Sequence, residues 1–160
     1  MNAKDIIKSQ IDMGNFVCQA YLADLTDEDL MRRAHAGVNH INWQVGHLIL
    51  AENYHGNMVT NGGMPSLPPG FAEKYHKDTA TSDDRDQFCT KEELLQAWAE
   101  QRAGTMAALA AISEGDLGLA TGVPYCPTKG EQLCLQGSHW LMHCGQWAVV
   151  RRQLGKPPLF

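Results

Sequence analysis

Two histidines, His139 and His143, lie four residues apart near the C-terminus in a stretch that otherwise has the pattern of an apolar helix. Residues i and i+4 of an α-helix are about 40° apart on one face, so both imidazoles can reach one metal ion. A third histidine, His47, lies in an equally apolar segment far upstream. Three neutral imidazoles leave a coordination position of a divalent ion open, whereas structural zinc sites usually fill all four. The pattern therefore predicts a catalytic type of metal site.

The predicted helical faces support this interpretation. At about 100° per residue, His47 lies at the centre of an apolar face of the segment 42–59, and the histidine pair lies on an apolar face of the segment 131–154. Burial of an imidazole without a partner costs about 1–3 kcal/mol. A single histidine on such a face is usually a core residue bonded to a carbonyl, but three of them favour a shared metal ion.

The remaining candidates for metal ligands are weaker. His55 projects about 80° from His47 and is a reserve ligand only. Cys126, in a predicted loop, is the one residue that could reach over as a fourth ligand and close the site. The other histidines fall in predicted loops or short turns and are expected to be exposed to solvent: His35, His40 and His76.

Two common metal chemistries do not fit the spacing. A thermolysin-like site requires a glutamate directly after the first histidine of the pair, and Trp140 stands there. A di-iron carboxylate bundle requires two Glu-x-x-His motifs, and the only copy, Glu52 to His55, points away from the His47 face. Neither inward face carries an Asp or Glu as an obvious general base. The metal would therefore supply most of the activation of a bound water or thiol.

One basic residue could contribute to substrate binding. Arg102 projects beside the apolar stripe of the third long helix. Its guanidinium could bind a substrate carboxylate through two parallel hydrogen bonds. Alternatively, its aliphatic stem packs at the edge of the core while its charged head reaches water.

Composition excludes several classes of protein. The 160 residues include 13 basic and 18 acidic side chains, a net charge of −5 that disfavours binding to nucleic acid. The chain has neither an apolar run of about 18 residues nor the apolar region of a signal peptide, so we expect no membrane segment. The five cysteines form no C-x-x-C pair and, being odd in number, cannot all pair, which favours a cytoplasmic location.

Four long helices are predicted by apolar periodicity, over residues 3–24, 42–59, 90–112 and 131–154. Capping sequences begin a short helical turn at Thr26 and the third long helix at Thr90. The Gly/Pro/Asp-rich connection 60–89 is long enough for a crossover between parallel helices. We therefore expect a single all-α domain over residues 1–160, a four-helix bundle with a long crossover between its second and third long helices.

The sequence resembles the DinB/YfiT-like superfamily of metal-binding four-helix bundles. The matching motifs are Asn42-Trp43-Gln44-Val45-Gly46-His47-Leu48, then His139-Trp140-Leu141-Met142-His143-Cys144-Gly145-Gln146, and the closing Leu154-Gly155-Lys156-Pro157-Pro158-Leu159. The resemblance implies an up-down-down-up course and a metal, usually nickel or zinc, held by His47, His139 and His143. It also implies that homodimers are common.

The resemblance suggests several functions. Some relatives transfer low-molecular-weight thiols such as bacillithiol or mycothiol, so we expect a cytoplasmic, metal-dependent thiol S-transferase that acts on a small molecule. A metal-dependent hydrolase and a non-catalytic metal-binding stress-response module remain alternatives. A second apolar set on the last helix also favours a homodimer: Leu141, Cys144 and Ala148.

Overall fold

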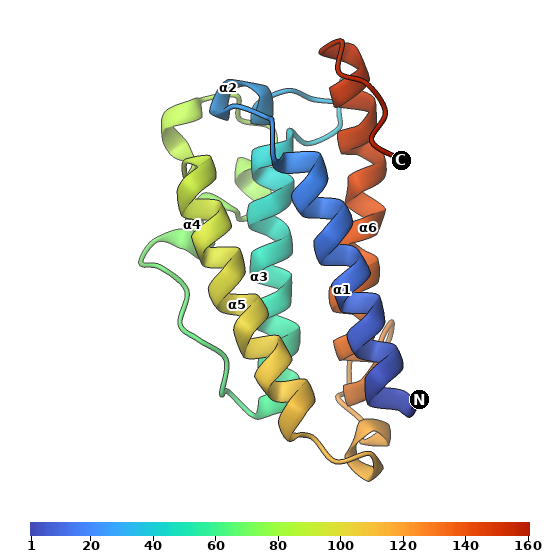
Figure 1. Ribbon diagram of the computed structural model, residues 1–160. Helices are drawn as coiled ribbons and strands as arrows, with labels where there is room; N and C mark the ends of the chain where they lie inside the picture. The colour runs from blue at the N-terminus through green and yellow to red at the C-terminus, as the bar shows by residue number, and fades with distance from the viewer.

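The computed structural model describes all 160 residues, and its regular secondary structure is helical, without β-strands. Its four long helices are α1 (Ala3–Leu22), α3 (Ile41–Thr60), α5 (Lys91–Ala111) and α6 (Lys129–Gln153). In Figure 1, α1 and α6 run upward while α3 and α5 run downward. The predicted all-α class is confirmed, and each long helix begins and ends within two residues of its expected position. No helix is both long and apolar enough to cross a bilayer.

Side-chain caps fix where most of the helices begin. Thr90 with Glu93 starts α5, and Thr26 with Asp29 starts the short α2 (Asp27–Leu30), as the sequence predicts. Two further capping boxes, Asn2 with Asp5 and Thr128 with Glu131, start α1 and α6. Each box satisfies backbone N–H groups that have no partner inside the helix. Local sequence therefore defines the N-terminal ends of these helices.

His40 caps α3 and is fully buried, so the expectation that it is exposed is wrong. Its Nδ1 accepts the backbone N–H of Trp43 at 3.0 Å, and its ring packs edge-on against Phe88. Burial lowers the pKa of His40 to about 4, which keeps the ring neutral and able to accept. His35 and His76 are exposed, as expected.

The crossover between α3 and α5 contains the short helices α4 (Phe71–Lys74), η1 (Lys77–Thr79) and η2 (Arg85–Gln87). Tyr75 anchors it to α3, because its ring occupies the space where a side chain at Gly46 would lie. The Tyr75 hydroxyl donates to Asn42 Oδ1 and accepts from the Cys89 backbone, both at 3.0 Å. The second connection contains η3 (Gly115–Gly118).

Helices α1 and α6 approach closely at two glycines. A Cβ atom on Gly137 would lie 2.5 Å from the carbonyl oxygen of Gln10, and one on Gly14 would lie 3.0 Å from the carbonyl oxygen of Gly137. Closer to the C-terminal ends of the same two helices, the sulfurs of Cys18 on α1 and Cys144 on α6 are 3.0 Å apart and buried. Of the second apolar set on α6, Cys144 is therefore buried against α1, whereas Leu141 and Ala148 are half-buried.

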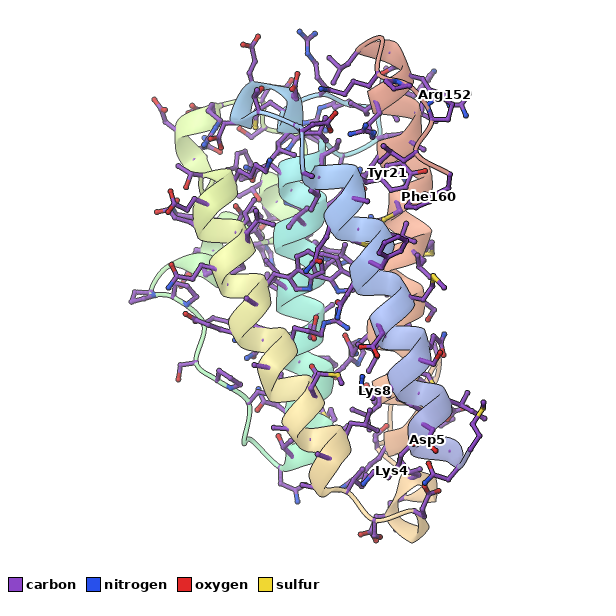
Figure 2. All side chains as sticks on the ribbon, viewed as in Figure 1. Lys4, Asp5, Lys8, Tyr21, Arg152 and Phe160 are labelled. Atoms are coloured by element: carbon purple, nitrogen blue, oxygen red, sulfur yellow. The ribbon has the colours of Figure 1, made fainter.

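The C-terminal segment returns along α6 and packs on α1. The Phe160 ring lies 5.5 Å from that of Phe16 and 6.0 Å from that of Tyr21, measured between centroids, and Figure 2 shows it beside Tyr21. Arg151 of α6 pairs with Asp24 just beyond α1, and Lys156 pairs with the same carboxylate at 3.2 Å.

A buried ion pair joins α3 to α5. Arg102 Nη2 lies 3.0 Å from Glu52 Oε2, and Thr105 donates to the other carboxylate oxygen at 2.7 Å. Arg102 Nη1 also donates to the carbonyl of Gln136 on α6 at 3.0 Å. Burial raises the pKa of Glu52 and lowers that of Arg102, and the attraction between the two charges opposes both shifts. The head of Arg102 therefore lies inside the protein and does not reach water.

Candidate metal centre

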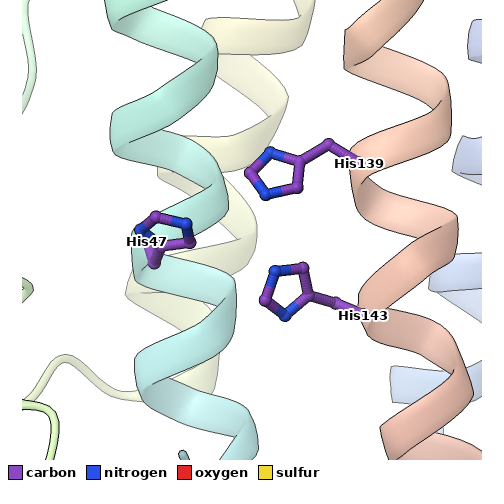
Figure 3. Close-up of side chains that lie close together, drawn as sticks. All are labelled: His47, His139 and His143. Atoms are coloured by element: carbon purple, nitrogen blue, oxygen red, sulfur yellow. The ribbon is translucent and has the colours of Figure 1, made fainter. Parts of the chain in front are cut away.

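The structure brings together the three histidines selected from the sequence. One ring nitrogen from each of His47, His139 and His143 lies within 4.8 Å of the others. Figure 3 shows His139 and His143 extending from one face of α6 toward His47 on α3. The ring centroids are 5.1 to 5.8 Å apart. The two helices thus hold three imidazoles around one shared space.

Burial keeps these imidazoles neutral. It lowers the pKa of all three, and together with repulsion from the neighbouring histidines it brings the pKa of His139 and of His143 to about 4. Neutral imidazole is the form that binds metal, because its unprotonated nitrogen carries a free lone pair. All three rings are therefore ready to bind an ion at neutral pH.

Gln44 fixes which nitrogen of His143 carries the proton. Trp147 Nε1–H donates to Gln44 Oε1 at 3.0 Å, while Gln44 Nε2 donates to the carbonyl of Asn39 and, at 2.9 Å, to Gln146 Oε1. Because its Oε1 can only accept, the 2.9 Å contact with His143 Nδ1 requires the proton on Nδ1. Nε2 of His143 is then free for a metal, an arrangement that commonly orients metal-binding histidines.

Trp43 orients His47 by stacking. The two rings are nearly parallel, with an angle of 6° between their planes and 5.1 Å between their centroids. Trp43 is itself held by a hydrogen bond from its Nε1 to Thr79 Oγ1 at 3.0 Å, in the crossover. The crossover therefore contributes to the position of the His47 ring.

A cavity of about 350 Å³ opens beside the histidines. Its lining is mostly apolar: His47, Ala51, His55, Tyr125, Leu135, His139 and Met142. Met142 and Tyr125 are 66% and 70% exposed and lie where the cavity meets solvent. The cavity can admit a small molecule with an apolar part to His47 and His139, which line it.

Two expected contributors lie outside this cavity. Cys126 is buried but is not among the residues that could share an ion with the three histidines. Arg102 lines a separate groove of about 500 Å³, together with Asn15 and Lys91. His55, which the sequence offered only as a reserve ligand, lies on the cavity wall.

The residues present suit a divalent transition ion. Three imidazole nitrogens are the protein ligands of several catalytic zinc sites, and imidazole also suits nickel. Ligand nitrogens of a tetrahedral zinc site lie about 3.3 Å apart, given Zn–N bonds of 2.0–2.1 Å. To bind one ion, the three nitrogens would have to approach one another from their present spacing, which is within 4.8 Å.

Comparisons with known proteins identify the fold and the family. The structure resembles the crystal structure of a conserved protein from Enterococcus faecalis, with a TM-score of 0.72 and 17% sequence identity over 98% of this chain and 99% of that one. At this identity the likeness supports the fold alone. A search of curated proteins finds no match. The family model described as the DinB superfamily matches residues 17–147, which include all three histidines. The chain belongs to the DinB superfamily.

Proposed function

We propose that the protein is a metal-dependent thiol S-transferase that binds nickel or zinc through His47, His139 and His143. The observation that carries this proposal is the convergence of three neutral imidazoles beside a mostly apolar cavity. A divalent ion held by neutral ligands alone keeps its full charge and would lower the pKa of a bound thiol or water. The helix directions in Figure 1 support assigning the fold to the up-down-down-up four-helix bundles of the superfamily.

The lining of the cavity favours a thiol over a hydrolytic water. Ala51, Leu135 and Met142 present an apolar surface that suits a thiol and an uncharged electrophile. None of the lining residues is an Asp or Glu, the usual carboxylate base of a metallohydrolase. A metal-dependent hydrolase and a non-catalytic metal-binding module are the alternatives that the assays below must separate.

Metal content tests the site directly. Protein purified without a histidine tag is expected to carry about one divalent transition ion per chain by elemental analysis. The variant His139→Ala/His143→Ala is expected to lose it while keeping its helical circular dichroism spectrum, because two of the three ligands are gone. The variant His35→Ala, at an exposed histidine, is the control. Undiminished metal in the double variant would contradict the assignment.

The reaction is tested with a thiol-reactive electrophile, such as a fluorogenic bimane halide, offered with glutathione, coenzyme A, bacillithiol or mycothiol. Thiol-dependent turnover that is lost in the double variant would support the transferase. Hydrolysis of an activated ester without any thiol would support the hydrolase, and absence of both activities in metal-loaded protein would favour the non-catalytic module.

We also propose that the chain forms a homodimer. Five apolar side chains of α1 and α6 are between 45% and 66% exposed: Ile6, Met13, Phe16, Met142 and Val149. Light scattering at micromolar concentration is expected to give twice the chain mass, and Phe16→Glu is expected to reduce it to one chain because a charge would enter the contact. A single-chain mass for the unaltered protein would contradict the dimer.

A further inference from the structure

His55 shares the cavity with the metal ligands but is not one of them. It follows His47 by two turns of α3, and its ring is 3% exposed. The amide of Gln132 on α6 determines its tautomer. Gln132 Nε2 donates to the Cys126 carbonyl at 2.7 Å and to Thr121 Oγ1 at 3.0 Å, so Gln132 Oε1 faces His55 Nδ1. Because Oε1 can only accept, Nδ1 carries the proton and Nε2 carries a lone pair.

The unprotonated nitrogen faces a residue at the cavity mouth. Tyr125 places its hydroxyl 3.4 Å from His55 Nε2, and the two rings meet edge-on. This contact is longer than a normal hydrogen bond, so an entering ligand loses little by replacing it. Burial lowers the pKa of His55, while the bond to Gln132 opposes this shift, and the ring is neutral at pH 7.

We propose that His55 Nε2 is the proton acceptor for the thiol that enters this cavity. The inference rests on the proposed function and assigns a base to it. His47 and His139, which share the cavity, would use their lone pairs to hold the metal. Tyr125 and Tyr54 also face the His55 ring, but a phenol is protonated at pH 7 and is a poor proton acceptor. His55 is therefore the remaining base among the residues that line the cavity.

The proton balance is complete within this site. The S–H bond breaks and its proton moves to His55 Nε2, while the electron pair stays on sulfur. The sulfur then forms a bond to the electrophilic carbon, and the bond from that carbon to the leaving group breaks. The leaving group takes the proton from Nε2, which returns the ring to its neutral state. The net reaction joins thiol and electrophile and releases the protonated leaving group.

Proton release on thiol binding tests the role of His55. We suggest titrating zinc-loaded protein with 2-mercaptoethanol at pH 7 in buffers of different ionisation enthalpy. The unaltered protein is expected to release less than one proton per thiol bound, because the bound thiolate stabilises the protonated His55 ring beside it, whereas His55→Gln is expected to release about one. Thiol-dependent turnover of His55→Gln is expected to fall by about 10²-fold, the low end for loss of a general base. Metal content should stay unchanged.

Two controls keep the outcomes separate. Tyr125→Phe removes only the hydroxyl and is expected to release as few protons as the unaltered protein does. Nitrogen-15 NMR of the unaltered protein, without thiol, is expected to show an unprotonated Nε2 at His55. A protonated Nε2, or one proton released by the unaltered protein, would overturn the role of His55 alone. Failure of any thiol to bind the unaltered protein would instead overturn the proposed function.

Discussion

At the scale of single residues, the segment from Asn42 to His47 positions the candidate metal centre from several sides. Asn42 holds Tyr75 of the crossover, and Gly46 leaves room for the Tyr75 ring. Trp43 stacks on His47, and Gln44 reaches across to His143 on α6. Such supporting contacts orient metal-binding side chains. This segment thus supplies one proposed ligand and orients two.

Gln44 is predicted to control metal affinity without being a ligand. Gln44→Leu removes the acceptor for His143 Nδ1–H and is expected to weaken metal binding by about 10–100-fold, measured by competition with a chromophoric chelator. Gln146→Leu is the matched control, because Gln44 keeps its bond to the Asn39 carbonyl. Equal affinity of Gln44→Leu and the unaltered protein would show that the tautomer of His143 does not depend on Gln44.

The sequence identified the three histidines because each lies on an apolar helical face, where a polar side chain needs a partner. It missed Gln44, although Gln44 lies three residues before His47 and therefore on nearly the same face. It also left His55 as a reserve ligand only. The cavity that His55 lines is completed by Tyr125, which comes from a loop distant in the sequence. Only the packing of that loop onto α3 and α6 brings these residues together, and no periodicity encodes it.

At the scale of elements, the contact between α1 and α6 depends on Gly137. Gly137→Ala would place a methyl group 2.5 Å from the Gln10 carbonyl oxygen, and we expect it to destabilise the fold by about 1–3 kcal/mol. Gly145→Ala, in the same helix but with open space around it, is expected to stabilise by up to about 1 kcal/mol. Urea unfolding of both variants measures the difference. Similar free energies of unfolding for the two variants would show that α1 can move away from α6 without loss of stability.

Helix positions were largely predictable because they are encoded locally. The boxes at Thr26 and Thr90 mark helix starts in four consecutive residues, and apolar spacing marks the faces. The attachment of the crossover was not predictable, because Tyr75 and Gly46 are far apart in the sequence and meet only in the fold. For the same reason the sequence could not show that α1 covers Cys144.

At the scale of the whole molecule, the core does not depend on the metal. Clusters of 20 and 7 buried apolar residues hold the helices together, and the three histidines belong to neither. Chelation is therefore expected to leave the helical circular dichroism spectrum intact while lowering Tm. Metal at a thousandfold excess over Kd would stabilise the native state by about 4 kcal/mol. The His139→Ala/His143→Ala variant should show no such dependence on metal, and a random-coil spectrum after chelation would contradict the prediction.

The pairing of the first long helix with the last has a consequence for synthesis on the ribosome. α1 packs more extensively on α6 than any other two helices pack on each other, yet α6 begins only at Lys129. The nascent chain therefore carries α1 without its main partner until α6 has been synthesised, and this long-range closure slows folding. His47 likewise meets His139 and His143 only then. Insertion of the proposed metal would thus have to follow the synthesis of α6, and a chain that stalls before α6 would expose an apolar helix to chaperones and proteases.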